Sequence, residues 1–313
     1  MNVIAQTVRP RFAAYHADTI DVAKSLPDAS VHLSIFSPPF SSLFVYSASD
    51  RDLGNVRGDE EFFSHYRYLA AEQRRVMMPG RIVAVHCMDL PTSKSRDGYI
   101  GLKDFPGELI RIYQAAGFVF HSRFTIWKNP VTAMQRTKAL GLLHKQLRKD
   151  SCMSRQGIPD YLLMFRTPGA NPEPVSHTHE TFPVDLWQRY ASPVWATTNG
   201  KVDDEGFGVC ADPSADGEDQ GGIRQTEVLQ YRQAREHDDE KHVCPLQLEV
   251  IRRAVRLWSN PGDIVWSPFM GIGSEGVVAL QMGRRFIGAE LKGSYYESAV
   301  RSLEAVDVGA VAA

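Results

Sequence analysis

The chain has 313 residues, of which 43% are hydrophobic, 23% charged and 10% aromatic, and this composition excludes collagen-like, coiled-coil and wholly disordered proteins. There is no run of about 18 apolar residues and no apolar signal core near the N-terminus, so we expect a cytoplasmic protein without a membrane span. The four cysteines form no CxxC pair, and we therefore expect neither a metal site nor a disulfide framework.

The net charge of -2 conceals a segregation of charge along the chain. Eight Lys and Arg residues lie between positions 123 and 155, where Asp150 is the one acidic residue. Seven acidic residues lie between positions 201 and 220 with Lys201 as the one basic residue. The basic stretch is consistent with a solvated face or with a nucleic-acid contact. The acidic stretch is consistent with a mobile loop, a DNA-mimicking brake or a dimer contact.

In chain order, apolar runs predict strands and 3.6-residue spacing predicts helices. The first half of the sequence predicts a short helix at 23–26, a strand at 30–36, a helix at 60–78, a strand at 81–87, a helix at 108–116, and strands at 118–127 and 161–166. From 167 to 239 the pattern is irregular. The last part predicts a helix at 246–258, a strand at 264–266, a helix at 275–282 and a strand at 285–289. Strands that alternate with helices and are apolar throughout indicate an α/β fold, with a mostly parallel twisted sheet covered by helices on both faces.

A glycine-containing segment, 267–274, lies between a predicted strand and a predicted helix. Gly271 and Gly273 allow the backbone to approach a ligand closely, and the helix start offers unpaired N–H groups. Glu290 ends the next strand, where a carboxylate is placed to accept hydrogen bonds from ribose hydroxyls. The alternative is a purely structural turn. The order of strand, loop, helix, strand and acid favours a cofactor that contains a nucleoside. The segment is neither a phosphate-binding P-loop nor the GxGxxG of nicotinamide enzymes.

A second motif, Ser37-Pro38-Pro39-Phe40, follows the strand predicted at 30–36. One interpretation is a strand terminator, because two prolines cannot continue a central ladder. The other is a rigid cradle for an amino group. The two prolines lack N–H donors, so the carbonyl oxygens and the Ser37 hydroxyl are left as acceptors, and Phe40 can stack on a base.

These two motifs, in this order, resemble those of the β-class S-adenosylmethionine-dependent DNA amino-methyltransferases, specifically the stand-alone, phage-associated type. The resemblance implies a Rossmann-like methyltransferase fold with a permuted motif order, and S-adenosyl-L-methionine as cofactor. It implies that the catalytic residues are Ser37, Pro38, Pro39 and Phe40. It also implies that the cofactor-binding residues are Asp18, Pro268, Phe269, Gly271, Gly273, Ser274 and Glu290. The sequence departs from the family where Ser267 replaces an Asp, Cys244 a Lys and Ala17 a Gly.

The resemblance also implies how the chain is divided. We expect a catalytic and cofactor-binding domain from residues 1–128 and 241–306, an irregular target-recognition insertion with a mobile loop at 129–240, and a tail at 307–313. The expected partners are double-stranded DNA and a second copy of the chain in a homodimer, with no membrane and no restriction-enzyme partner.

Candidate DNA-binding residues come from the strand end near position 127 and from the basic stretch. They are Trp127, Lys128, Arg136, Lys138, Lys145, Arg148, Lys149 and Arg155. Trp127 is equally consistent with a buried residue that closes a strand. His86 and His121 lie in predicted strands, where satisfied core histidines are the expected interpretation.

The sequence thus predicts a site-specific DNA methyltransferase that acts on the exocyclic amine of a flipped base. N6 of adenine is the preferred acceptor and N4 of cytosine is the alternative. Two other classes stay open at this point, because fold alone does not decide function. They are an RNA or small-molecule methyltransferase and an inactive nucleic-acid-binding protein.

Overall fold

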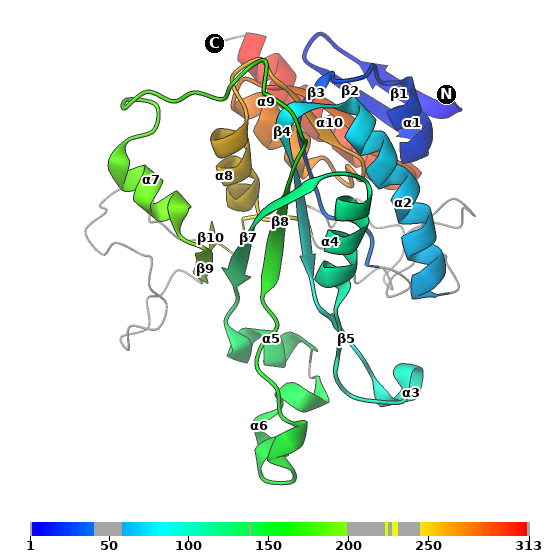
Figure 1. Ribbon diagram of the computed structural model, residues 1–313, viewed down its shortest axis with the longest axis vertical. Coiled ribbons are helices and arrows are strands. Elements are labelled where there is room, and N and C mark those ends of the chain that lie inside the picture. The colour runs from blue at the N-terminus through cyan, green and yellow to red at the C-terminus, as the bar shows by residue number, and fades with distance from the viewer. Residues whose placement is uncertain are drawn as a thin grey trace.

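The computed structural model describes residues 2–40, 58–137, 139–198, 223–224, 227–230 and 245–311. Figure 1 shows a central sheet with helices on both faces and a small helical lobe that projects from one end of the sheet. The acidic stretch between positions 201 and 220, Cys210 and Cys244 lie outside the described residues.

In the described part of the chain, ten strands form one sheet in the order β1-β2-β12-β11-β3-β4-β8-β7-β9-β10. These strands are β1 (Val3–Val8), β2 (Phe12–Ala17), β3 (Val31–Phe36), β4 (Met77–Met88), β7 (Val119–Trp127), β8 (Asp160–Arg166), β9 (Val194–Thr198), β10 (Ile223–Arg224), β11 (Ile264–Ser267) and β12 (Arg285–Glu290). A separate pair consists of β5 (Leu90–Pro91) and β6 (Leu102–Lys103). Within the sheet, β2, β12, β11, β3 and β4 run parallel to one another, whereas β8 runs antiparallel to both β4 and β7.

Helices cover both faces of the sheet (Figure 1). The α-helices are α1 (Thr19–Ser25), α2 (Asp59–Val76), α3 (Lys94–Asp97), α4 (Phe105–Ala115), α5 (Pro130–Thr137), α6 (His144–Leu147), α7 (Val184–Ala191), α8 (Leu248–Trp258), α9 (Ser274–Gln281) and α10 (Gly293–Val311). Two 3₁₀ turns, η3 (Leu140–Leu142) and η4 (Ser151–Met153), flank α6. Side-chain caps fix where three of these helices begin. Side-chain oxygens of Asp18, Ser93 and Asp104 accept backbone N–H hydrogen bonds at the N-termini of α1, α3 and α4.

Two hydrophobic clusters lie on opposite faces of the sheet. One joins α8, α9 and α10 to strand residues such as Leu33 and Ile35, and the other joins α2 and α4 to Val31, Val83 and Val85. Every residue of β3 is buried, as expected for a central strand of a parallel sheet with helices on both sides. The α/β class predicted from the sequence is therefore confirmed.

The structure corrects the boundaries expected for the insertion and the tail. The segment 129–240 contributes β8 to the interior of the sheet between β4 and β7, so it is not a single insertion outside the catalytic sheet. β8 is almost fully buried and pairs with a strand on each side, which explains why its sequence is mostly apolar. At the other end, α10 continues to Val311, so the tail expected from residue 307 begins inside a helix.

The antiparallel β1–β2 hairpin was not expected from the sequence. β1 is the edge strand and is largely exposed, so it lacks the apolar run that marks the central strands. Residues 167–198 are also more regular than expected, because they form α7 and the strand β9, which pairs parallel with β7.

Candidate active site

The tetrapeptide Ser37-Pro38-Pro39-Phe40 begins where β3 ends, at the carboxyl edge of the parallel strands. Ser37 is half-buried and Pro38 is buried. The Phe40 ring packs edge-on against Phe105 of α4, with centroids 6.1 Å apart, and Phe105 in turn belongs to the cluster beneath α2 and α4. The structure thus fixes the tetrapeptide against the core at both of its ends.

The glycine loop follows β11 at the same edge. Both Gly271 and Gly273 have positive φ values, +54° and +93°, in the left-handed region that favours glycine. A Cβ on Gly273 would lie 3.2 Å from Ala299 of α10, so this glycine also permits a close approach of loop and helix. The Met270 N–H donates to the Ala289 carbonyl oxygen over 2.8 Å, which ties the loop to β12.

Glu290, at the end of β12, is held by two backbone donors. Its Oε2 accepts from the Gly271 N–H over 2.8 Å and its Oε1 from the Lys292 N–H over 2.9 Å. β2 pairs with β12 in register His16–Glu290, so Asp18 lies just beyond the same edge. Asp18 Oδ1 accepts from the Ile20 N–H over 2.8 Å as the cap of α1. The carboxylate of Glu290 is thereby fixed beside the glycine loop.

The two motifs lie on neighbouring strands. β11 pairs parallel with β3, with Val265 opposite Leu33 and Trp266 opposite Ser34. The rings of Phe36 and Phe269 contact each other, with centroids 5.7 Å apart. The tetrapeptide and the glycine loop therefore share one rim of the sheet.

The residues around the glycine loop fit a nucleoside-containing ligand. A Cβ built on Gly271 would meet no atom within 4 Å, so the backbone faces open space there. Among the described residues, the buried hydroxyls of Ser267, Ser274 and Thr19 have no hydrogen-bond partner. Buried hydroxyls normally find partners, and these three are free to accept one from a polar ligand.

Glu275, in the first turn of α9, lies directly behind the loop and is buried. Burial, with a smaller contribution from the charge of Glu290, raises its pKa to about 8. At neutral pH this side chain is therefore mainly the neutral acid, and Glu290 is the carboxylate on the ligand side of the loop.

His86 of β4 contacts the tetrapeptide directly, which the sequence interpretation missed. Its Nδ1 lies 2.9 Å from Ser37 Oγ, and its Nε2 lies 3.1 Å from Asp160 Oδ2. The expectation that His86 is a satisfied strand histidine is confirmed, but its partner is the first residue of the motif. The pairing register of β3 and β4 explains the contact. Phe36 pairs with Val85, so the next residues of the two strands, Ser37 and His86, lie side by side.

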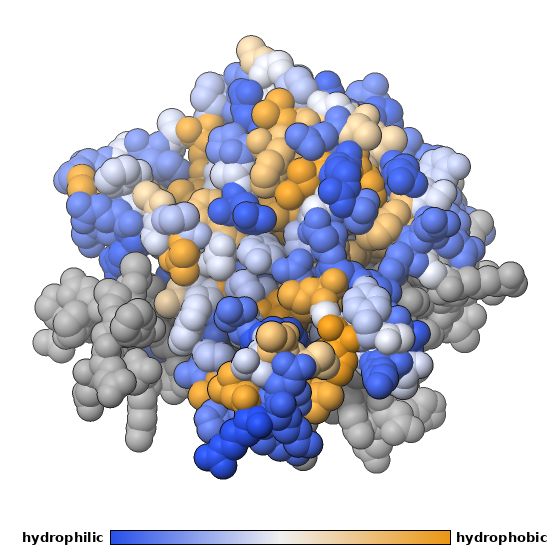
Figure 2. Space-filling model, turned by 60° about the horizontal axis from the view of Figure 1, so that its bottom comes forward, coloured by the Kyte–Doolittle hydropathy of each residue, from blue (hydrophilic) through white to orange (hydrophobic). Residues whose placement is uncertain are grey.

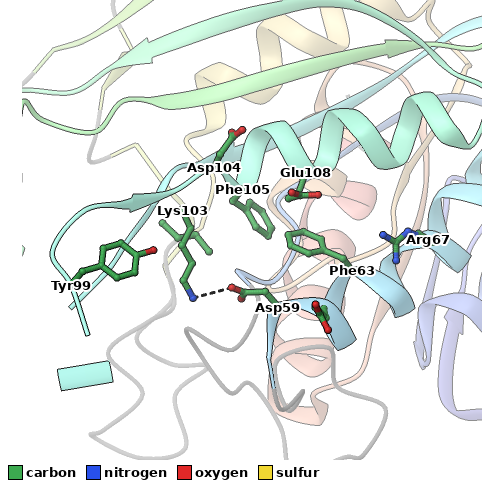
Figure 3. A pocket seen from close by; sticks show the side chains of 10 residues that line it. Asp59, Phe63, Arg67, Tyr99, Lys103, Asp104, Phe105 and Glu108 are labelled. Carbon is green, nitrogen blue, oxygen red and sulfur yellow. Dashed lines mark hydrogen bonds and ion pairs between the residues drawn. The ribbon is translucent and has the colours of Figure 1, made fainter. Parts of the chain in front are cut away.

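A cavity of about 670 Å³ lies beside the tetrapeptide, between the first turns of α2 and α4 (Figure 3). Phe63 and Phe105 both line it, and their rings contact each other with centroids 5.6 Å apart. Lys103 Nζ contacts Asp59 Oδ2 over 2.9 Å at its rim. The cavity does not include the glycine loop, and it reaches the candidate site through Phe105, the ring that supports Phe40.

The predicted DNA-binding residues of the basic stretch fall into three groups. Lys145, Arg148 and Lys149 are exposed on the lobe formed by α5, η3, α6 and η4, where Figure 2 shows strongly hydrophilic residues beside apolar ones. Arg155 is partly buried under the lobe, where burial lowers its pKa, and its backbone N–H donates to the Gly141 carbonyl oxygen. The third group, Lys138 and the side chain of Arg136, lies outside the described residues.

The strand end at Trp127 and Lys128 lies nearer the tetrapeptide than the lobe does. Lys128 Nζ lies 2.5 Å from Asp160 Oδ2, the carboxylate that also contacts His86. Trp127 is partly buried and ends β7, with Ala196 of β9 as its pairing partner. The structure therefore links Lys128 to the site by an ion pair.

One cluster in the described residues has the geometry of metal ligands, far from the tetrapeptide. His32, Glu173 and Asp263 bring their ligand atoms within 4.8 Å of one another. However, His32 Nδ1 accepts from the Ile264 N–H, and the buried guanidinium of Arg81 lies 3.1 Å from Asp263. A cation of the chain itself thus balances these carboxylates.

Residues 31–301 match the family model N6_N4_Mtase, which is described as DNA methylase. The chain belongs to this DNA methylase family. The methylase is 24% identical over 312 residues to the Type II methyltransferase M.Cfr9I of Citrobacter freundii, covering 95% of this chain and 89% of the relative. It is 23% identical over 291 residues to M.BglII of Bacillus subtilis, covering 92% and 68%.

Solved structures share the fold of this methylase. TTHA0409 of Thermus thermophilus, complexed with S-adenosyl-L-methionine, matches with a TM-score of 0.61 at 20% identity, covering 95% of this chain and 93% of that one. The cytosine-N4-specific PvuII DNA methyltransferase matches with a TM-score of 0.61 at 14% identity, covering 98% and 94%. Among the described residues, no helix is both long and apolar enough to cross a bilayer.

Proposed function

We propose that this enzyme transfers a methyl group from S-adenosyl-L-methionine to the exocyclic amine of a flipped base in double-stranded DNA, with N6 of adenine as the acceptor. The observation that carries the proposal is the pairing of β3 with β11, which places the tetrapeptide and the glycine loop at one edge. A methyl donor and an acceptor amine must lie in contact for direct transfer, and this edge offers a place for each.

The tetrapeptide holds the acceptor amine. Pro38 and Pro39 have no N–H groups, so Ser37 Oγ and the Pro38 carbonyl oxygen are the acceptors that face an amino group. An aromatic amine is a weak nucleophile because its lone pair is delocalised into the ring. Acceptors fixed on its two hydrogens favour the pyramidal nitrogen of the transition state. Phe40, braced by Phe105, stacks on the base.

The glycine loop and Glu290 hold the cofactor, which supplies an electrophilic methyl group when bound. Glu290 is oriented by the N–H groups of Gly271 and Lys292 and accepts from ribose hydroxyls. The remaining cofactor-binding residues in this proposal are Asp18, Pro268, Phe269, Gly273 and Ser274. The partnerless hydroxyl of Ser274 supports this assignment.

The lobe formed by α5, η3, α6 and η4 and the end of β7 at Trp127 bind the DNA. The exposed cations of α6 and the turn after it contact phosphates, and this supplies affinity that does not depend on sequence. A base within a duplex cannot reach the edge of the sheet, so the target base leaves the stack.

Transfer of tritiated methyl groups from S-adenosyl-L-methionine to duplex DNA tests the proposal. We expect incorporation by the wild type, and a loss of at least about 100-fold in the Ser37→Ala/Phe40→Ala double variant. The exposed Ser95→Ala serves as the matched control and retains activity. Full activity of the double variant would refute the assigned roles.

Mass spectrometry of nucleosides from the methylated DNA identifies the acceptor. N6-methyladenine is the expected product, and N4-methylcytosine identifies the alternative acceptor. The proposal further includes a homodimer that acts without a restriction-enzyme partner, and light scattering of the purified protein with and without DNA measures its oligomeric state.

A further inference from the structure

Four side chains form a continuous line of polar contacts from the tetrapeptide into the sheet. Ser37 Oγ lies 2.9 Å from His86 Nδ1, His86 Nε2 lies 3.1 Å from Asp160 Oδ2, and Lys128 Nζ lies 2.5 Å from the same oxygen. The four residues come from the ends of β3 and β7 and from β4 and β8, which are consecutive strands in the sheet. The line is therefore built into the most regular part of the fold.

Asp160 fixes the direction of every hydrogen bond in this line. Burial raises the pKa of its carboxyl group, but the charge of Lys128 and the contact with His86 outweigh burial and leave the pKa below its ordinary value. The ionised carboxylate can only accept, so the hydrogen of the imidazole resides on His86 Nε2. In the neutral ring His86 Nδ1 then carries a lone pair, to which the Ser37 hydroxyl can donate.

We propose that His86, oriented by Asp160, is a positioning residue that turns the Ser37 hydroxyl into a fixed acceptor for the amino group of the target base. With its one hydrogen directed to His86, Ser37 Oγ has both lone pairs left to accept N–H hydrogens. Without His86 the hydroxyl rotates among several partners and presents its hydrogen to the base in some of them. This inference rests on the proposed function, because it assigns a role relative to the acceptor amine.

Two substitutions of similar size separate this role from a merely structural one. In His86→Asn, the side-chain oxygen lies near the position of Nδ1 and can accept from Ser37. In His86→Gln, the amide lies near the position of Nε2 and reaches Asp160 instead. If His86 acts through Ser37, His86→Asn retains much of the wild-type kcat, whereas His86→Gln and His86→Ala lose roughly tenfold or more.

The steady-state measurement follows kcat and KM for DNA and for the cofactor in each variant. We expect kcat to fall while both KM values stay within about twofold, because the contact acts on the reacting amine and not on binding. His121→Gln, on the exposed start of β7, is the matched histidine control and retains the wild-type kcat. Equal losses in His86→Asn and His86→Gln would overturn the proposal.

A double-mutant cycle tests whether the effect passes through Ser37. We expect the Ser37→Ala/His86→Ala variant to have the kcat of Ser37→Ala alone, because the second change has no hydroxyl left to orient. Multiplicative losses would show that His86 acts independently of Ser37 and would overturn the proposal. Thermal unfolding of each variant identifies any loss that comes from misfolding, and the two isosteric variants keep the test decisive in that case.

A readout without turnover separates this inference from the proposed function. Long-range ¹H–¹⁵N correlation spectra of the free protein, with labelled histidines, report which nitrogen of His86 carries hydrogen. We expect the Nε2–H tautomer in the wild type and in Ser37→Ala, and an Nδ1–H tautomer would overturn the inference even if methyl transfer is observed. Absence of methyl transfer to DNA by the wild type would instead refute the proposed function while leaving the tautomer result intact.

Discussion

The aromatic rings of Phe36 and Phe269 lie with their centroids 5.7 Å apart and join the two loops of the candidate site. Phe36 is the last residue of β3 and is fully buried, whereas Phe269 lies in the glycine loop after β11. Because the two strands are paired, the contact holds the loop on one side and the tetrapeptide on the other at a fixed separation. The geometry of the site is thus set by the core of the sheet and not by the loops alone.

The open space over Gly271 gives the first prediction. A Cβ there meets no atom within 4 Å, and the same is true of Gly262 in the turn before β11. Both glycines have positive φ, so Gly271→Ala and Gly262→Ala each cost about 1 kcal/mol of folding stability. Of the two added methyl groups, only that of Gly271→Ala projects into the proposed cofactor site. Calorimetric titration should show at least about tenfold weaker cofactor binding for Gly271→Ala, and unchanged binding for Gly262→Ala.

Equal cofactor affinity in the two alanine variants would contradict the assignment of the loop. The comparison is informative because both substitutions introduce the same kind of backbone strain, whereas only the carbon added at Gly271 lies in the proposed cofactor site. Urea unfolding of both variants measures that shared cost directly.

Much of this site could be predicted from the sequence because its parts are local. The strands β3 and β11 are short apolar runs that end abruptly, at Pro38 and at Pro268, and each carries its motif immediately after the last paired residue. In a parallel sheet such positions lie at one edge whatever the register, so the order of motifs was sufficient to place them together.

The contact between Ser37 and His86 could not be predicted in the same way. It depends on β4 lying beside β3 with Val85 opposite Phe36, and a shift of one residue would point His86 to the other face of the sheet. The ion pair of Lys128 with Asp160 depends similarly on β8 returning antiparallel between β4 and β7. Register and strand order are tertiary properties, and hydrophobic periodicity does not encode them.

The buried acid behind the glycine loop gives a pH-dependent prediction. In the folded protein burial raises the pKa of Glu275 to about 8, whereas the unfolded chain has the ordinary value near 4.5. Between these values the folded state binds the additional proton, so this group stabilises the protein fully below about pH 4.5 and the stabilisation is lost as the pH rises towards 8. Glu275→Gln removes the titration while preserving the neutral shape.

Urea unfolding without cofactor at pH 5, 6.5 and 8 measures this effect. The free energy of unfolding of Glu275→Gln, relative to the wild type, should rise with pH by about 1 kcal/mol per unit within this window. A difference that stays constant across the three pH values would show that Glu275 titrates alike in the folded and unfolded chains.

A buried polar network under α2 and α4 gives a stability prediction. The Tyr113 hydroxyl donates to Gln73 Oε1 over 2.5 Å and lies 3.2 Å from the Tyr66 hydroxyl, while Gln73 Nε2 donates to Ser34 Oγ. Tyr113→Phe leaves Gln73 Oε1 and the Tyr66 hydroxyl buried with fewer partners. We expect a loss of about 1–3 kcal/mol in the free energy of unfolding, measured by urea denaturation.

Tyr68→Phe is the matched control for this network. Tyr68 lies on the same helix as Tyr66 but is 66% exposed, so removal of its hydroxyl should change stability by less than about 0.5 kcal/mol. Similar values for the two variants would mean that the hydroxyl of Tyr113 contributes no net stabilisation to the contact between α2 and α4.

The basic lobe gives the last prediction, which concerns DNA affinity. Arg148 and Lys149 are exposed just beyond α6, on the lobe formed by α5, η3, α6 and η4. If both contact phosphates, the Arg148→Ala/Lys149→Ala variant should bind duplex DNA more weakly for every sequence. Its plot of log affinity against log salt concentration should be shallower by about two, since each lost contact releases about one fewer counterion. Fluorescence anisotropy at several salt concentrations provides the measurement.

The matched control removes the same charge away from the lobe. Lys24 and Arg301 are exposed on α1 and α10, so the control variant is Lys24→Ala/Arg301→Ala. An equal change of slope in that control would mean that net charge, and not the lobe, governs binding.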